Sequence, residues 1–183
     1  MLDTPSALHA AIGNAHQLVR GTSGKRDGEA TVVAAAVRAD AAYFANVGDS
    51  RAYLYSQGNL LQVTRDHSWV QEQVRAGSLS AEQALGHPWR SVITRSVGGA
   101  EAPAVDIFER RLEPGSRVLL CSDGLGKVLG SEELVTALEQ RDAAATVKSL
   151  LTLATRRGVF DDVTVCVLDV HAGGAVGAGQ MHG

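Results

Sequence analysis

The chain has 183 residues, of which 45% are hydrophobic and 20% are charged, and its formal net charge at pH 7 is −3. This is the composition of an ordinary globular domain that can bury a substantial core. The mildly acidic balance argues against a basic nucleic-acid-binding surface. An aromatic content of 4% argues against a base-stacking platform as well.

The pattern of apolar residues and cysteines indicates a cellular compartment. No apolar run approaches the length of a membrane span, and the N-terminus shows no basic-then-apolar signal pattern. Cys121 and Cys166 both lie inside apolar strand signals, which favours two reduced, buried thiols over a disulfide. We therefore expect a cytoplasmic protein that binds neither membrane nor nucleic acid.

The first part of the chain predicts one helix followed by short strands. Apolar residues at helical spacing predict a helix over residues 5–20. Strands are expected over 31–37, 42–47, 52–55 and 60–63. Gly48-Asp49-Ser50 is typical of a tight turn between two of them. We therefore expect these strands to form an antiparallel meander, with Arg51 pairing with Asp49 or another nearby acid.

The remainder mixes helix and strand signals. Helices are expected over 64–76, 79–85, 131–140 and 142–157, and strands over 92–97, 105–110, 117–121 and 163–170. After His171 the chain is mostly glycine and alanine, which cannot build a core. The sequence therefore predicts one domain over 1–170 and a disordered Gly/Ala-rich tail over 171–183.

Three aspartates stand at the ends of predicted strands, in Gly48-Asp49-Ser50, Ser122-Asp123-Gly124 and Phe160-Asp161-Asp162. A strand end holds a side chain rigidly, and carboxylate oxygens are the ligands that Mg²⁺ and Mn²⁺ prefer. No cluster of histidine or cysteine in the sequence competes for a softer metal. The alternative for each aspartate is a turn-forming role without a metal.

These stretches, in this order, resemble the metal-dependent type 2C (PPM) serine/threonine protein phosphatases from about Ala7 to about Val170. The stretches that carry the resemblance are 45–54, 60–77, 92–99, 119–125 and 161–167. The resemblance implies an α+β fold in which two antiparallel sheets pack as a sandwich with helices outside (α-β-β-α), incomplete at the N-terminus. It also implies hydrolysis of phosphoserine or phosphothreonine in proteins by a metal-activated water, with two or more Mg²⁺ or Mn²⁺ ions.

Site residues follow from the same resemblance. Asp123 and Asp161 match the family's metal-ligating aspartates, and Asp49 matches an aspartate linked to a third, weaker metal. Residues expected to support these ligands are Asp162, Arg51, Ser122 and Gly124. No catalytic group beyond the metal ligands is expected, since water attacks the phosphorus directly. The implied partner is a phosphoprotein substrate, with the phosphatase opposing a serine/threonine kinase.

The segment after Thr64 resembles the flap beside the family's active site, which tunes access and substrate choice. The alternative is a surface helical insertion without such a role. His67 lies in Asp66-His67-Ser68 at the start of this segment. We expect a structural or supporting role for His67 and not direct metal ligation.

The chain departs from the family pattern in two places. The family has an early strand that ends in an Asp-Gly-x-Gly motif, whose aspartate bridges the two catalytic metals, and this chain has no such motif ahead of the helix expected over 5–20. Lys127 stands where the family often has another acid, and a lysine there would repel a third metal. Open explanations are a fragment of a longer phosphatase, a start lying upstream, or a product without activity. A catalytically inactive binding or regulatory module with the phosphatase fold is the alternative function.

Overall fold

The structure is a computed structural model that describes residues 3–22, 28–159, 161–172 and 176–182. In these residues the strands form two antiparallel sheets, ordered β1-β2-β5 and β4-β3-β6-β7-β8. The strands of the first sheet are β1 (Val32–Arg38), β2 (Ala41–Val47) and β5 (Asp106–Arg111). Those of the second are β3 (Arg51–Ser56), β4 (Asn59–Gln62), β6 (Arg117–Cys121), β7 (Thr164–Val170) and β8 (Val176–His182).

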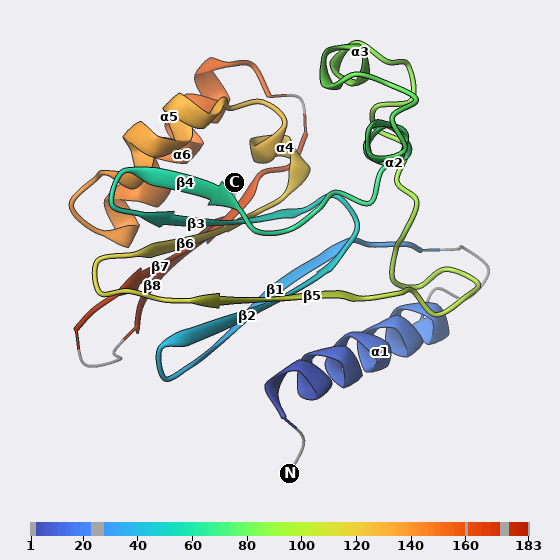
Figure 1. Ribbon diagram of the computed structural model, residues 1–183, viewed down its shortest axis with the longest axis horizontal. Coiled ribbons are helices and arrows are strands. Elements are labelled where there is room, and N and C mark those ends of the chain that lie inside the picture. Colours follow the sequence, from blue (N-terminus) through green and yellow to red (C-terminus); the bar gives the residue numbers. More distant parts are fainter. Residues whose placement is uncertain (1–2, 23–27, 160, 173–175, 183) are drawn as a thin grey trace.

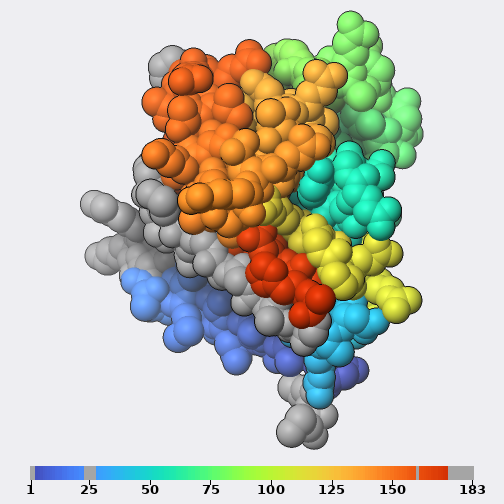
Figure 2. Space-filling view, turned by 90° about the vertical axis from the view of Figure 1, so that its left-hand side faces the viewer, coloured from blue at the N-terminus to red at the C-terminus, as the bar shows by residue number. Residues whose placement is uncertain are grey.

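The longer helices lie on the outer faces of the sheets, and the shorter ones lie toward one end (Figure 1). The helices are α1 (Thr4–Thr22), α2 (Trp69–Arg75), α3 (Ala81–Leu85), α4 (Asp123–Gly126), α5 (Ser131–Leu138) and α6 (Ala143–Arg156). Helix α1 covers the first sheet, α5 and α6 cover the second, and α2 and α3 project at one end (Figure 1). Figure 2 shows α5 and α6 in orange on the opposite side of the molecule from α1 in blue. The predicted α+β sandwich with outer helices is confirmed.

Alternation along the strands explains why the sheets pack in this way. In β6, Val118 packs with Phe44 in the core between the sheets, while Leu119 packs with Leu150 in the core beneath the helices. Neighbouring residues of a strand point to opposite faces, so a strand that is apolar on both faces needs cover on both sides. Helix α6 supplies that cover with one apolar face, including Val147 as predicted.

The predicted meander is wrong at one connection, because β2 and β3 lie in different sheets. Hairpins join β1 to β2 and β3 to β4. Between β2 and β3, Gly48 has φ = +107°, and a Cβ there would lie 2.3 Å from Cγ2 of Thr31. Glycine therefore lets the chain cross from one sheet to the other at this corner. The crossover leaves Asp49 at one end of the sandwich.

The predicted strand over 92–97 is not formed. This segment makes only isolated bridges, Ser68 with Ile93 and Ala30 with Val97. It is held by single backbone contacts, such as Thr94 N–H donating to the carbonyl of His67 at 2.9 Å. The apolar run therefore packs without a strand partner. The helix expected over 64–76 begins only at Trp69, and the other predicted elements lie close to their expected bounds.

The C-terminal segment also differs from expectation. Residues 176–182 form β8 and pair with β7, from Thr164 opposite His182 to Val170 opposite Val176. Ladder hydrogen bonds join backbone groups, so even a segment with few large apolar side chains can pair with an open strand edge. The prediction of disorder is thus wrong for 176–182, while 173–175 and 183 lie outside the described residues.

Both cysteines are free thiols. Across the β6–β7 ladder Cys121 lies opposite Val165 and Cys166 opposite Leu120, so their side chains point to opposite faces of the sheet. Burial raises the pKa of Cys121 to about 12. Both thiols are therefore free as expected, but only Cys121 is buried, while Cys166 is half-buried. Within the described segments, no helix combines the length and apolar character needed to cross a membrane.

Candidate metal centre and adjoining cleft

Asp49 and Asp123 meet at one end of the sandwich, where a single ammonium group contacts both. Asp123 opens α4 directly after β6, and Asp49 lies in the crossover after β2. Nζ of Lys127 lies 2.5 Å from Oδ2 of Asp49 and 2.9 Å from Oδ2 of Asp123. The sequence predicted that the two aspartates share a site, but not that Lys127 would join them.

This ion-paired cluster is partly shielded from water. The side chain of Asp49 is 6% exposed, that of Lys127 is 27% exposed and that of Asp123 is 32% exposed. Burial alone would lower the pKa of Lys127, but hydrogen bonds and charge interactions with both aspartates outweigh it and raise the pKa. Lys127 therefore carries a full positive charge between the two carboxylates.

Asp161 and Asp162 lie in a neighbouring loop that packs on the Asp123 loop. Ser122 Oγ donates to the carbonyl of Asp162 at 3.2 Å, and a Cβ on Gly124 would lie 2.7 Å from that oxygen. Ser122 and Gly124 thus hold the two loops together. The backbone N–H of Asp162 donates a hydrogen bond to the carboxylate of Asp161 at 2.8 Å.

The carboxylate oxygens in this region are suitable ligands for a hard cation, but there are too few of them to complete its coordination. Across the described ranges, no group of three or more His, Cys, Asp or Glu side chains is placed to hold a metal ion. Mg²⁺ and Mn²⁺ prefer roughly six oxygen ligands, and the Asp49–Asp123 pair supplies two carboxylates with Lys127 between them. The described side chains therefore do not by themselves form a complete divalent-metal site.

Arg51 does not pair with Asp49. Its Nε lies 3.0 Å from Oδ1 of Asp66 and its Nη2 lies 2.7 Å from Oδ2, and Arg51 also donates to the carbonyl of Gly126. The side chain of Asp66 is 4% exposed. The bidentate pair thus ties β3 both to the segment before α2 and to the end of α4. Sequence reasoning missed Asp66 as the partner, although it precedes His67 in a stretch already singled out.

His67 braces the crossover that carries Asp49. Gly48 N–H donates to Nδ1 of His67 at 3.1 Å, and His67 N–H donates to the carbonyl of Gly48 at 2.9 Å. On the other side of the ring, Nε2 lies 3.2 Å from Oδ2 of Asp106. These contacts confirm the expected structural role.

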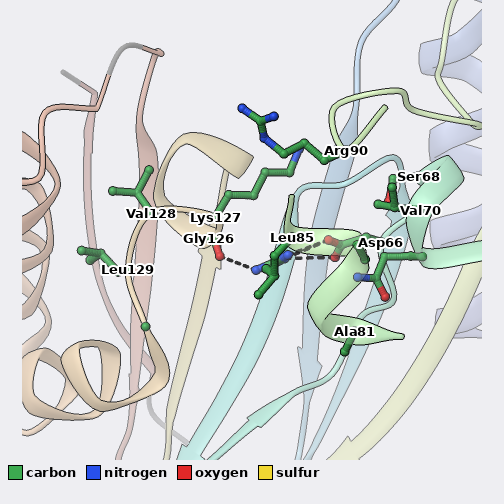
Figure 3. Close-up of a pocket in the computed structure, with 14 residues that line it drawn as sticks. Asp66, Ser68, Val70, Ala81, Leu85, Arg90, Gly126, Lys127, Val128 and Leu129 are labelled. Carbon is green, nitrogen blue, oxygen red and sulfur yellow. Dashed lines mark hydrogen bonds and ion pairs between the residues drawn. The ribbon is translucent and has the colours of Figure 1, made fainter. Parts of the chain in front are cut away.

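A cleft of about 470 Å³ adjoins the ion-paired cluster (Figure 3). It lies between the α2–α3 region and the chain from Gly126 to Gly130, and Lys127 and Arg90 line it together. Its apolar lining residues are Val70, Ala81, Ala84, Leu85, Val128 and Leu129. Leu85 is 79% exposed. In the described part of the chain the guanidinium of Arg90 has no acidic partner.

Comparisons with known proteins agree with this architecture. The family described as Protein phosphatase 2C matches residues 3–159. A putative protein phosphatase 2C-type protein of Streptococcus pyogenes is 37% identical over 139 residues, covering 75% of this chain and 56% of the relative. The serine/threonine protein phosphatase PstP of Mycobacterium tuberculosis is 42% identical over 126 residues, covering 68% of this chain and 24% of PstP.

Solved structures give the same result. The S. agalactiae serine/threonine phosphatase has a TM-score of 0.83 at 33% identity, over 91% of this chain and 72% of that one. The catalytic domain of PstP in complex with two manganese ions has a TM-score of 0.80 at 31% identity, over 90% and 70%. The chain thus spans 56% and 24% of the lengths of the two sequence relatives. Because the family match covers most of the chain and the folds agree, the chain belongs to the protein phosphatase 2C family.

Proposed function

We propose that this chain contributes to the metal-dependent hydrolysis of phosphoserine or phosphothreonine in proteins. The observation that carries the proposal is the convergence of Asp49 and Asp123, distant in sequence, at one end of a phosphatase-type sandwich. Relatives named serine/threonine phosphatases support the reaction class. The buried Cys121, with its raised pKa, is unsuited to act as a nucleophile.

Mg²⁺ or Mn²⁺ is the proposed cofactor, because a related catalytic domain is in complex with two manganese ions. Asp49, Asp123 and Asp161 are its proposed ligands, with further ligands required beyond the described side chains. Bound cations would supply the acidity that makes water a nucleophile and the charge that offsets the phosphoryl oxygens. The chain's own residues hold the acids in place, through the Gly48–His67 contacts and the Ser122–Asp162 contact.

The phosphorylated polypeptide is proposed to lie in the cleft beside Lys127. An apolar lining suits a hydrophobic side chain of the substrate, and the unpaired Arg90 suits an acidic group near it. This placement agrees with the flap role expected for the α2–α3 region. The proposed setting is the cytoplasm, where the protein would oppose a serine/threonine kinase.

A phosphoprotein-binding module without activity is the alternative. Lys127 between Asp49 and Asp123 favours it, as does the lack of a group of three metal-binding side chains in the described residues. In such a module the cleft would still bind a phosphorylated chain.

Turnover of a phosphothreonine peptide distinguishes the two functions. The chain would be assayed with Mn²⁺ and with chelator, beside Asp123→Ala and the surface control Asp40→Ala. If the chain is an enzyme, we expect Mn²⁺-dependent phosphate release that is abolished in Asp123→Ala and kept in Asp40→Ala. Peptide binding without phosphate release from folded protein would instead establish the binding module.

A further inference from the structure

Lys127 reaches the two acids from a backbone that is fixed on both sides. Its N–H donates to the carbonyl of Asp123 at 2.9 Å, within one helical turn. The residue before it, Gly126, accepts a hydrogen bond from Arg51, and a Cβ on Gly126 would lie 2.9 Å from Cδ of Arg51. Arg51 is itself fixed by its bidentate pair with Asp66. The backbone that carries Lys127 is therefore set by the surrounding structure, and the two carboxylates hold its ammonium.

The ammonium lies where a cation bridging Asp49 and Asp123 would have to lie. It contacts one oxygen of each carboxylate, at 2.5 Å and 2.9 Å. An ammonium and a divalent cation cannot both occupy the position between these two oxygens, and at contact distance the two cations also repel one another. Lys127 contacts Oδ2 of Asp123, which leaves Oδ1 of the same carboxylate without a hydrogen-bond partner among the described residues.

We propose that Lys127 is a built-in counter-ion that replaces a divalent cation between Asp49 and Asp123. Asp49 is then held by Lys127 and leaves the set of proposed metal ligands, while Asp123 keeps one oxygen that Lys127 does not contact. The inference rests on the proposed function for the assignment of Asp123 and Asp161 to a metal. It narrows that proposal, because a chain with Lys127 should bind one divalent cation fewer than the same chain without this lysine.

Calorimetric titration of the chelator-treated chain with Mn²⁺ tests this inference without any activity assay. Lys127→Gln removes the charge, Lys127→Arg keeps it, and Lys148→Gln makes the same charge change at an exposed position on α6. We expect Lys127→Gln to bind one more Mn²⁺, or to bind Mn²⁺ at least about tenfold more tightly, which is the effect of one relieved charge contact. Lys127→Arg and Lys148→Gln should match the wild type.

The double variant Asp49→Asn/Lys127→Gln locates the gained site, because the inference predicts that the gain disappears when Asp49 loses its charge. Thermal melting without metal gives a second readout: Lys127→Gln should melt lower than the wild type, and Mn²⁺ should raise its melting temperature more. Equal Mn²⁺ binding by the wild type and Lys127→Gln would overturn the inference alone. No Mn²⁺ binding by any of these chains would overturn both the inference and the proposed metal site.

Discussion

At the scale of single residues, the missing side chain of Gly124 sets how closely the Asp123 and Asp161 loops approach. A Cβ there would lie 2.7 Å from a backbone oxygen of Asp162, so one loop must move. We expect Gly124→Ala to cost about 1–3 kcal/mol of stability, as overpacking does, and to weaken Mn²⁺ binding. Urea denaturation and Mn²⁺ titration measure both effects.

Gly13→Ala is the matched control, because no atom lies within 4 Å of its added Cβ. Inside α1 this change should be neutral or stabilising by up to about 1 kcal/mol. Equal stability of the Gly124→Ala variant and the wild type would contradict the close approach.

The lowered pKa of His67 should make the stability of the folded chain depend on pH. Burial lowers its pKa most, Asp106 offsets part of that effect, and Arg95 adds to the lowering. The unfolded chain, with an ordinary histidine pKa of about 6.5, therefore takes up a proton at higher pH than the folded chain does. Stability should fall as pH decreases below about 6.5, and urea melts at a series of pH values measure this slope.

Removing the ring should reduce that dependence. His67→Gln is expected to lose stability at neutral pH, since the Gly48 contact is lost, and to show a shallower fall between about pH 6.5 and 5. His9→Gln, at an exposed position of α1, should keep the wild-type slope. An unchanged slope in His67→Gln would show that other groups cause the pH dependence.

At the scale of the elements, one ion pair joins the second sheet to its helices. Nε of Arg117 on β6 lies 2.5 Å from Oδ1 of Asp169 on β7, while Oδ2 of Asp169 accepts from the N–H of Ala143 at the start of α6. The two side chains are 11% and 13% exposed. We expect Asp169→Asn to cost about 3–5 kcal/mol, because it leaves a buried guanidinium without its counter-charge.

Asp40→Asn tests whether burial is the reason for the large loss of stability expected in Asp169→Asn. Asp40 pairs with Arg111 at 3.3 Å, but these side chains are 67% and 81% exposed. An exposed pair contributes about 0–1 kcal/mol, so this variant should unfold at nearly the wild-type urea concentration. Similar losses in both variants would contradict the argument from burial.

The cleft beside α3 makes a second prediction at this scale. Leu85 lines the cleft and is 79% exposed, so Leu85→Asp should fold normally. If the substrate chain buries Leu85, the variant should bind a fluorescent phosphothreonine peptide with an apolar flank at least about tenfold more weakly, as measured by anisotropy. Leu18→Asp on α1, where Leu18 is 69% exposed, should bind like the wild type. Equal binding by all three proteins would place the peptide elsewhere.

At the scale of the whole molecule, periodic patterns predicted most helices and strands. They did not predict which strands, far apart in the sequence, pair with one another. The apolar face of α6 and the continuous apolar run in β6 predicted both elements and their burial. The pattern Gly48-Asp49-Ser50 predicts a hairpin turn but forms a crossover between sheets, because both need the same residue types. Which of the two forms depends on where the next strand finds its partner, and β3 pairs with the distant β6.

The same limit applies to the site. The order of Asp49, Asp123 and Asp161 could be predicted from motifs, and Lys127 was recognised as a departure from them. The contact of Lys127 with Asp123 follows helical spacing, but its contact with Asp49 depends on how the two sheets pack. No local pattern could therefore indicate that Lys127 would contact both carboxylates at once.

The pairing of β8 with β7 bears on whether the whole molecule stays monomeric. It closes one edge of the second sheet by pairing with β7 along Thr164–Val170. Removing residues 173–183 would leave the outer backbone groups of β7 unpaired, and such an edge invites pairing with a second copy of the chain. We expect the truncated chain to melt at a lower temperature and to self-associate, as measured by thermal denaturation and light scattering. A truncated chain that stays monomeric with an unchanged melting temperature would show that β8 contributes nothing to this edge.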